Sequence, residues 1–599
     1  MNARSPLVLA AVLALASPPA ARAVQVWTAT ATEKIRPAAP ARGDASAAIS
    51  AARNEFEAFQ LGVTGAASGV GAAASDLAGP GGTIAVRLYA EPIIWLQNPS
   101  APDGGSGGWP DALVPAVDEI VGEARNAFPF DVPDGESRAI WAEVHVPADA
   151  APGDYTGSVT VSWAGGSATV PVTLTVWPFA IPSTASLETS FGLGYGALPA
   201  EHGVSWGDDL SALRARYGQL GLEHRISLSK IDDGNPDLAH LTAFYGGELD
   251  GTLSTALRGA RLTSYELVGS AYADWASWFS ARGWADRLFQ YTCDEPPQTC
   301  AWSDIPARAA SAHAAVPPIR TLVTTSIQAA TANGVQDDID LLVPVVNSMD
   351  DRPGASAYAG DQRAAYDAFL ARGAPRELWL YQSCMSHGCG PDVNTGNWYF
   401  TGWPTYVIDA SATRNRAMEW LSFKYGATGE LYYDTCMAYG QDPWTNPWEF
   451  AGNGDGTLFY PGTVARIGGS TDIPIASIRL KMIREGMEDY EYLKILEDAG
   501  DGAFAHQVVD ALFPHPYQTD VSPGALLQAR AALAQRIVAL GLPGSTSGSG
   551  SGGGSASPGG PGTAPGIPVA SGCASGSGAG ILALAGLAAM AARRRRRRG

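Results

Sequence analysis

The sequence predicts a multidomain protein in which an N-terminal β-sandwich precedes an α/β barrel of the TIM-like (β/α)8 type and a C-terminal helical extension. Three observations lead to this prediction. The chain has 599 residues, a length that corresponds to roughly two to four domains. Its first part contains short runs in which apolar and polar residues alternate. Its second part alternates short apolar runs with helical patterns.

The predicted sandwich covers residues 24–180. Its clearest strands are Arg138–Val146, Asp154–Trp163 and Ala168–Trp177, and Gly165-Gly166 separates the last two as in a hairpin. Further strand-like runs are Phe56–Val63 and Ile84–Tyr89. Because several short strands occur here with no long helical pattern, we expect two packed sheets in a structural role.

The predicted barrel domain covers residues 181–500. Eight βα-like units over roughly 250 residues are what a (β/α)8 barrel needs. Helical patterns separate the apolar runs, as in Asp208–Leu220, Asp304–Ala315, Gly360–Arg372 and Ala412–Tyr425. The eight expected strands are Leu187–Gly192, Glu223–Leu228, Tyr265–Val268, Arg287–Cys293, Arg320–Ser326, Leu341–Asn347, Glu377–Ser383 and Glu430–Asp434.

The barrel domain is expected to end in a helix, and residues 501–543 to form a helical segment. Ile478, Met482, Met487 and Leu493 recur near helical spacing, so this helix should pack on the barrel. The charged residues on this helix are expected in ion pairs rather than in the site; they are Arg479, Arg484, Glu488 and Asp489. Ser522–Gly541 predicts a terminal amphipathic helix with Pro523 near its start.

Both ends of the chain have the patterns of targeting segments. Residues 1–23 have a basic start, an apolar stretch and an Ala-Arg-Ala end, which predict a secretory signal peptide. Residues 544–572 are almost wholly Gly, Ser, Pro, Ala and Thr and predict a flexible linker. In residues 573–599, Cys573 is followed by the apolar run Ala579–Ala592 and then six arginines. Fourteen helical residues would span about 21 Å, short of the roughly 30 Å hydrocarbon core of a bilayer.

This tail resembles the C-terminal sorting signal of myxobacterial surface proteins. The resemblance implies processing near Cys573, membrane contact through the tail, and a location at the cell surface, in the outer membrane or outside the cell. A disordered basic tail is the alternative.

The cysteines agree with export. Cys293 and Cys300, and Cys384 and Cys389, are close enough in sequence to form small disulfide loops in an oxidising compartment. A bond between Cys384 and Cys436 is an alternative pairing, and zinc binding is another, but only His387 falls at ligand spacing. We expect a Cys293 disulfide to brace the loop that follows it.

The composition excludes some classes of partner. The chain has 39 Lys and Arg against 59 Asp and Glu, and a net charge of −20. Such an acidic chain is not typical of nucleic-acid binding. Its 17 Trp and 21 Tyr suit sugar binding, although many will be core residues.

The most informative feature is Asp294-Glu295-Pro296, at the end of the fourth expected barrel strand. Neighbouring residues inside a strand point to opposite faces, but at the end of a strand both can turn toward one pocket. Barrel enzymes keep their catalytic groups at this end of their strands. Paired carboxyls in different environments can divide acid and base chemistry. Asp294 and Glu295 are therefore the catalytic candidates, and a polar loop start is the alternative.

Other strand ends supply candidates for substrate binding. They are polar or aromatic, although any strand must end in something polar. The candidates are Asn347, Tyr381, Gln382, Tyr433, Asp434 and Trp444. The later run Asn453-Gly-Asp-Gly lacks the remaining ligands of a calcium loop, so a glycine-supported turn is favoured, and no metal or organic cofactor is expected.

Three stretches together resemble glycoside hydrolase family 123. They are Ala52-Arg-Asn-Glu-Phe-Glu-Ala-Phe-Gln, Tyr291-Thr-Cys-Asp-Glu-Pro, and Asn453-Gly-Asp-Gly-Thr-Leu-Phe-Tyr-Pro-Gly with Pro474–Leu493. The resemblance implies a sandwich with a barrel, and retaining exo-hydrolysis of β-linked N-acetylgalactosamine. The implied partner is a glycan or glycoconjugate with a terminal N-acetylhexosamine.

The resemblance also implies substrate-assisted catalysis by the adjacent Asp294 and Glu295. Ordinary glycosidases hold two carboxyls on opposite sides of the bond, which consecutive residues do not readily do. By analogy, Asp294 orients the 2-acetamido group and Glu295 is the acid and base. Two alternatives remain open: a glycosidase of other sugar specificity, and a non-catalytic surface protein that binds glycans on a hydrolase scaffold.

Overall fold

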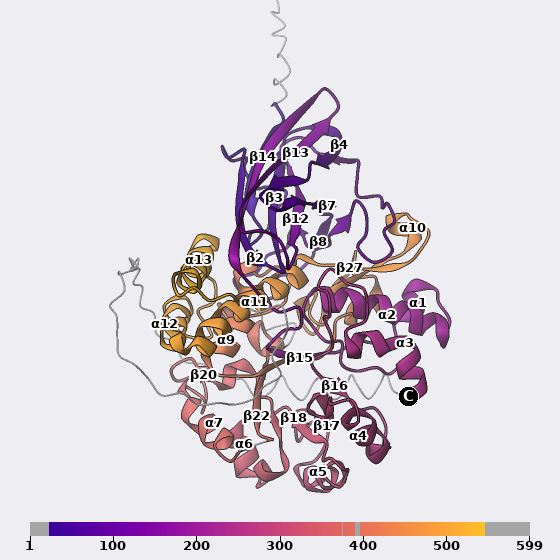
Figure 1. The fold of residues 1–599 in the computed structure, drawn as a ribbon, viewed down its shortest axis with the longest axis vertical. Coiled ribbons are helices and arrows are strands. Elements are labelled where there is room, and N and C mark those ends of the chain that lie inside the picture. Colours follow the sequence, from indigo (N-terminus) through magenta and orange to yellow (C-terminus); the bar gives the residue numbers. More distant parts are fainter. Residues whose placement is uncertain (1–22, 236, 374, 390–395, 545–599) are drawn as a thin grey trace, which may run out of the picture.

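A computed structural model describes residues 23–235, 237–373, 375–389 and 396–544. All but the last residue of the predicted signal peptide, most of the linker, and the tail with Cys573 lie outside the described residues. Figure 1 shows the N-terminal strands at one end of the molecule and the helical and barrel part at the other. No helix among the described residues is long and apolar enough to cross a membrane.

The N-terminal part contains two sheets that share one hydrophobic core. The core takes side chains from both sheets, including Leu61 and Ile140 of the first and Val159 and Leu174 of the second. Alternating residues leave one buried face on the strands Gly153–Trp163 and Gly166–Ala180. The strands Glu55–Thr64 and Ser137–Val146 are buried on both faces. The first sheet has the order β1 (Gln25–Thr30), β3 (Glu55–Thr64), β12 (Ser137–Val146), β7 (Val86–Ala90), β10 (Val114–Pro115). The second has the order β11 (Phe130–Val132), β4 (Ala67–Ala74), β13 (Gly153–Trp163), β14 (Gly166–Ala180), β2 (Ala47–Arg53). In addition, β5 (Leu77–Gly79) pairs with β13, and β6 (Gly82–Ile84) pairs with β5.

The hairpin expected around Gly165-Gly166 is confirmed. Strands β13 and β14 pair in antiparallel register from Gly153 opposite Val176 to Trp163 opposite Gly166. Gly165 has a φ of 95°, in the left-handed region that a tight turn needs. A smaller hairpin, β8 (Ile93–Leu96) with β9 (Gly107–Pro110), lies off the two sheets.

A parallel sheet of seven strands forms a nearly closed barrel in the second part of the chain. Seven of the eight expected strands are present, several of them shorter than predicted. In sheet order they are β15 (Glu188–Phe191), β23 (Gly429–Tyr432), β22 (Glu377–Tyr381), β19 (Leu341–Leu342), β18 (Arg320–Val323), β17 (Leu288–Cys293) and β16 (Tyr265–Glu266).

The prediction of a strand over Glu223–Leu228 is wrong. Glu223 is the last residue of α2 (Asp208–Glu223), and Arg225 has a left-handed φ of 59°. The next residues lie between β15 and β16, where Phe191 N–H donates to Ser227 O at 2.9 Å and Glu266 N–H to Ser229 O at 3.1 Å. Ser227 N–H instead donates to the Thr189 hydroxyl at 2.8 Å. Because a side-chain hydroxyl takes the place of a backbone acceptor, no regular strand forms in this gap.

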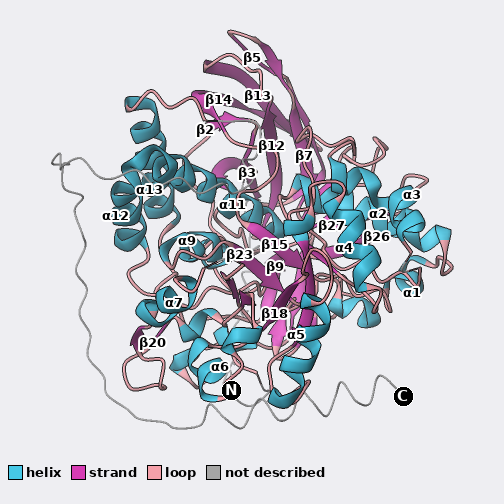
Figure 2. Cartoon of the chain, turned by 60° about the horizontal axis from the view of Figure 1, so that its bottom comes forward, coloured by secondary structure: helices cyan, strands magenta, loops and turns pink. Residues whose placement is uncertain are grey.

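Helices flank the barrel on two sides, with the strands between them (Figure 2). The expected helices are present, except that Ala412–Tyr425 is broken into two. The helices of the barrel part are α1 (Leu198–His202), α2, α3 (Leu238–Asp250), α4 (Tyr272–Ser280), α5 (Ile305–His313), α6 (Ile327–Ala332), α7 (Arg363–Leu370), α8 (Ala412–Asn415), α9 (Met418–Lys424) and α10 (Val464–Ile467). They are followed by α11 (Ile478–Leu496), α12 (Gly502–Leu512) and α13 (Pro523–Ala539).

Helix α11 joins the two parts of the molecule, and its charged residues are buried along with its apolar ones. Arg479 pairs with Asp111 at 2.7 Å, and Arg416 pairs with Asp489 at 2.6 Å. Lys481 and Arg484 both pair with Glu143 of β12, at 3.0 and 2.5 Å. The ion pairs expected on this helix are therefore confirmed, and they bind it to the N-terminal sheet.

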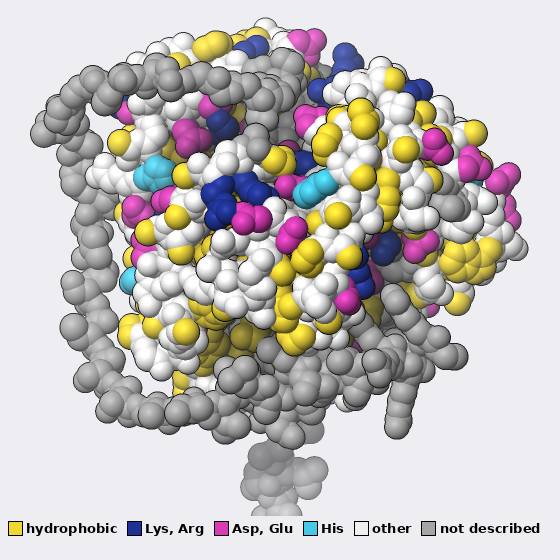
Figure 3. Space-filling model, turned by 90° about the horizontal axis from the view of Figure 1, so that it is seen from below, with side chains coloured by type: hydrophobic (Ala, Val, Ile, Leu, Met, Phe, Trp, Pro, Cys, Tyr) yellow, Lys and Arg dark blue, Asp and Glu magenta, His cyan; other side chains and the backbone are white. Residues whose placement is uncertain are grey.

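Charge is dispersed on the face of the molecule that Figure 3 shows. On the face in Figure 3, carboxylates in magenta are spread among apolar and uncharged side chains, and the basic side chains form only small groups.

Candidate active site

A pocket lies at the carboxyl ends of the barrel strands and contains both predicted catalytic carboxylates. Asp294 and Glu295 follow β17, Thr324 follows β18, Tyr381 ends β22 and Tyr433 follows β23. Parallel strands bring their carboxyl ends to one edge, so residues far apart in sequence meet there. The pocket is open to solvent on one side, and its empty space, the open mouth included, is about 710 Å³.

The backbone at Glu295 turns both carboxylates into this pocket. Glu295 has a φ of 45°, which breaks the alternation of a strand. Such a φ is uncommon for a residue other than glycine, and it occurs often at functional sites. Gln298 N–H donates to Glu295 O at 2.9 Å, so the loop folds back on itself.

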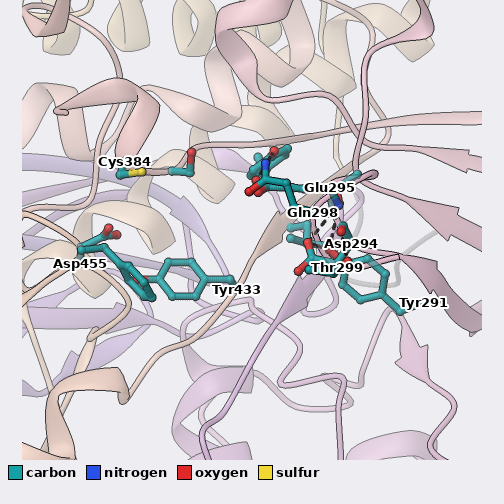
Figure 4. Close-up of a pocket in the computed structure, with 13 residues that line it drawn as sticks. Tyr291, Asp294, Glu295, Gln298, Thr299, Cys384, Tyr433 and Asp455 are labelled. Atoms are coloured by element: carbon teal, nitrogen blue, oxygen red, sulfur yellow. Dashed lines mark hydrogen bonds between the residues drawn. The ribbon is translucent and has the colours of Figure 1, made fainter. Parts of the chain in front are cut away.

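Hydroxyl groups hold the two carboxylates. Tyr291 and Thr324 donate to Asp294 Oδ1 at 2.9 and 3.1 Å, and Tyr381 donates to Glu295 Oε1 at 2.8 Å. The Thr324 hydroxyl also accepts the Glu295 N–H at 2.7 Å, so that one side chain orients both residues. Figure 4 shows Tyr291, Asp294 and Glu295 on the same side of the pocket.

The two tyrosines stay protonated. Burial raises the pKa of each phenol far above its ordinary value. The negative charge of Asp294 adds to this effect for Tyr291, and that of Glu295 adds to it for Tyr381. Each therefore remains a hydrogen-bond donor to its carboxylate. None of the described residues that line the pocket is a lysine or arginine.

Two disulfides border the site. Cys293 is bonded to Cys300, with Cα atoms 6.0 Å apart, and closes the loop that carries both carboxylates. Cys384 is bonded to Cys389, with Cα atoms 4.8 Å apart, and Cys384 lines the pocket. Cys436 is a buried free thiol, so the alternative Cys384–Cys436 bond is not formed. Within the described ranges, no group of three or more His, Cys, Asp or Glu side chains could hold a metal ion.

Of the six predicted substrate-binding residues, Tyr381 and Tyr433 line the pocket. The other four are outside its lining. Asn347 and Gln382 are buried, and Asn347 Nδ2 donates to Met385 O at 3.4 Å. Asp434 accepts N–H groups of Gly194, Thr435 and Cys436 at 3.1, 2.7 and 2.9 Å, so it shapes the turn after β23.

Trp444 is also outside the lining, in a different cluster. Its indole N–H donates to Pro461 O at 3.1 Å, and its ring packs on Tyr460 at 4.9 Å. It thereby joins the apolar cluster that the β8–β9 hairpin also enters.

Several lining residues were missed by sequence reasoning, chiefly Phe450 and Asp455. The glycine-supported turn is confirmed, since Gly454 and Gly456 have φ values of 78° and 66°. This turn also places Asp455 at the pocket, where its Oδ1 accepts the Tyr432 hydroxyl at 3.1 Å. The sequence did contain a signal for Asp455, which is the glycine on either side of it. A turn built on such glycines can present the side chain between them to a site.

The comparisons with known proteins point to one enzyme class. The family model described as "Glycoside hydrolase 123, catalytic domain" matches residues 389–496. That range contains Tyr433, Phe450 and Asp455 but not Asp294 or Glu295. No curated protein matches the sequence.

Among solved structures, a family 123 glycoside hydrolase from Clostridium perfringens, studied for glycolipid glycan hydrolysis, superposes with a TM-score of 0.62 at 11% identity. The match covers 87% of this chain and all of that one, and shows a shared fold. A putative α-galactosidase from Bacteroides fragilis (12% identity, 67% of this chain and 74% of that chain) has a TM-score of 0.19, too low to support an argument. The family match and the shared fold together identify this chain as a glycoside hydrolase.

Proposed function

We propose that the protein is an exported, retaining, exo-acting β-N-acetylgalactosaminidase-like enzyme in which the 2-acetamido group of the substrate is the nucleophile. The observation that carries the proposal is the convergence of consecutive carboxylates, Asp294 and Glu295, in one pocket. Carboxylates on the same wall are badly placed to work from opposite faces of a glycosidic bond, as ordinary two-carboxylate glycosidases do. They are well placed to serve a nucleophile that the substrate supplies.

In the first step, the acetamido oxygen attacks C1 and the bond from C1 to the leaving oxygen breaks. Glu295 gives its proton to that oxygen, and Tyr381 holds the carboxyl in place. Asp294 orients the acetamido N–H and balances the charge of the oxazolinium ion. Its own orientation is fixed by the Tyr291 and Thr324 hydroxyls.

In the second step, Glu295 takes a proton from water as the water oxygen attacks C1, and the bond from C1 to the acetamido oxygen breaks, which opens the oxazolinium ring and restores the acetamido group. Two displacements at C1 restore the original configuration, as retention requires. Tyr433, which lines the same pocket, is proposed to contact the sugar.

A panel of aryl glycosides tests the proposal. We expect hydrolysis of 2-acetamido β-glycosides and little hydrolysis of the matching 2-hydroxy sugars. A thiazoline analogue of the intermediate should inhibit the enzyme, because it mimics the species that the site stabilises. Hydrolysis of 2-hydroxy sugars at equal rates would favour a glycosidase of other specificity. Binding of glycans without any hydrolysis would favour the non-catalytic surface protein.

The location is a separate part of the proposal. It is supported by the signal-peptide pattern of residues 1–23 and by the cysteine and arginine pattern of residues 573–599. Removal of residues 574–599 should release active enzyme into the medium without a change in turnover. Retention of the intact protein in the cytoplasm would contradict this part.

A further inference from the structure

A strained hairpin loop carries one of the pocket residues. Strands β24 (Trp448–Glu449) and β25 (Gly452–Asn453) pair in antiparallel register, Glu449 opposite Gly452, which leaves a two-residue loop. Both loop residues, Phe450 and Ala451, have left-handed φ values, 43° and 64°. Loops of this kind favour Asn-Gly, because Cβ atoms make the conformation unfavourable for other residues. The sequence Phe-Ala is therefore an unexpected choice for this turn.

Contacts around the hairpin hold it in this conformation. Gln441 Nε2 donates to Trp448 O at 2.8 Å, and Asn453 Nδ2 donates to Asn98 O at 2.8 Å. On the inner side, Gly452 lies so close to His387 that a Cβ there would be 2.5 Å from Nε2. Strained residues persist where the surroundings fix them, and they are concentrated at functional sites.

The strained conformation places the Phe450 ring in the wall of the pocket. The ring packs edge-to-face on Tyr433, with centroids 5.5 Å apart and planes at 74°. Both rings line the same pocket as Asp294 and Glu295. Figure 4 shows Tyr433 on the side of the pocket opposite the labelled residues of the 294–299 loop. The pocket thus has a carboxylate wall with Asp294 and Glu295 and an aromatic wall with Tyr433 and Phe450. Asp455 lies on the same side as Tyr433 (Figure 4).

We propose that Phe450 is a specificity-determining residue whose ring, supported by Tyr433, packs against the apolar face of the terminal sugar. A pyranose has one face rich in C–H groups, and such a face packs well on an aromatic ring. In the galacto configuration the axial 4-hydroxyl leaves C3–H, C4–H and C5–H together on that face, whereas the gluco configuration interrupts it. The inference rests on the proposed function and gives it a physical basis for preferring N-acetylgalactosamine over its 4-epimer.

The test compares three variants on both epimers. Phe450→Ala removes the ring but keeps a Cβ at the strained position. Its kcat/KM for the aryl N-acetylgalactosaminide should fall about tenfold or more, the scale of losing an apolar contact, and for the N-acetylglucosaminide about threefold or less. Phe450→Tyr should keep the wild-type ratio. Ala451→Gly relieves the neighbouring strain, so it should raise Tm and leave both rates within about twofold.

Binding separates this inference from the proposed function. Affinities of the full-length protein for N-acetylgalactosamine and N-acetylglucosamine can be measured even if no glycoside is hydrolysed, and Phe450→Ala should lower the ratio of the two. A Phe450→Ala variant with the wild-type melting temperature and an unchanged ratio, in affinity and in any rate measured, would overturn the inference. That result would leave substrate assistance by Asp294 and Glu295 intact.

Discussion

The pocket and the α11 interface both contain carboxylates, but their neighbours differ. In the pocket, Asp294 and Glu295 are half-buried and accept hydrogen bonds from tyrosine and threonine hydroxyls. At the interface, Glu143 is 1% exposed and pairs with Lys481 and Arg484. Burial alone would raise the pKa of Glu143, yet these two cations hold it well below the ordinary value.

Under the proposed function, this difference separates a reactive carboxylate from a structural one. A carboxylate fixed between buried cations stays ionised and cannot exchange protons with a substrate. A carboxylate held by neutral hydroxyls at an open pocket can be reached by a substrate and by water. Two of the three stretches that resemble family 123, Ala52–Gln60 and Pro474–Leu493, meet at this interface. There Phe56 N–H donates to Glu488 Oε1 at 3.1 Å. These two stretches therefore reflect how the two parts of the molecule join, and not the reaction in the pocket.

The largest expected effect comes from the pocket. Glu295→Gln should lower kcat on substrates with poor leaving groups by about 10²–10⁴-fold, because the proton donor is lost. The loss should be much smaller on activated aryl glycosides, whose leaving groups need no proton. Parallel assays on the two substrate types, with Tm as the control for folding, check this prediction. Equal losses on both would remove Glu295 from the acid role.

The interface should show the opposite behaviour. Glu143→Gln leaves two buried cations without their carboxylate, and we expect the free energy of unfolding to fall by about 3–5 kcal/mol. The specific activity of the folded enzyme should not change. Urea unfolding measures the loss. Asp367→Asn, which removes an exposed pair with Arg363 at 2.6 Å, is the matched control and should cost less than about 1 kcal/mol. Equal losses for the two variants would show that burial of the pair is unimportant.

A third carboxylate sharpens the comparison, because Glu91 is buried without a cation. Neither of its oxygens has a hydrogen-bond partner among the described residues, and burial raises its pKa to about 8. The folded state therefore binds its proton more tightly than the unfolded state does. Stability from this group is fully present below about pH 4.5, and it is lost as the pH rises toward 8.

Glu91→Gln should remove that dependence. We expect the variant to match wild type near pH 4.5 and to exceed its free energy of unfolding at pH 8 by on the order of 2–4 kcal/mol. Denaturant unfolding at a series of pH values measures this. A constant difference at all pH values would mean that Glu91 does not titrate in this range.

The smallest expected effect concerns a hydroxyl partner in the pocket. Tyr381→Phe removes the donor to Glu295 but leaves the ring, and kcat/KM should fall about tenfold, the worth of one hydrogen bond to a charged group. Tm should change little. A loss as large as that of Glu295→Gln would instead give Tyr381 a direct part in proton transfer.

Local patterns in the sequence predicted much of the fold. The β13–β14 hairpin and the strand before Asp294 depend on residues close in sequence, and they were located correctly. The missing strand after α2 was not predictable, because its ladder is replaced by the Thr189 hydroxyl from another strand. The carboxylate wall of the pocket comes from one short loop and was predicted. The aromatic wall was predicted only in part. Tyr433 lies at the end of a predicted strand, whereas Phe450 faces a loop more than 150 residues away in sequence, and no local pattern reveals that pairing.

The central claim is that the substrate's own acetamido group is the nucleophile. Substrates that differ in the electron density of the acetamido oxygen test this claim most directly. Aryl glycosides in which the acetamido methyl carries zero, one, two or three fluorines differ in the nucleophilicity of that oxygen and little in size. Substrate assistance predicts that kcat/KM falls steeply with each added fluorine, because electron withdrawal weakens the attack on C1. A rate that does not depend on fluorine number, together with a covalent sugar adduct on Asp294 or Glu295 in the mass spectrum, would contradict the account.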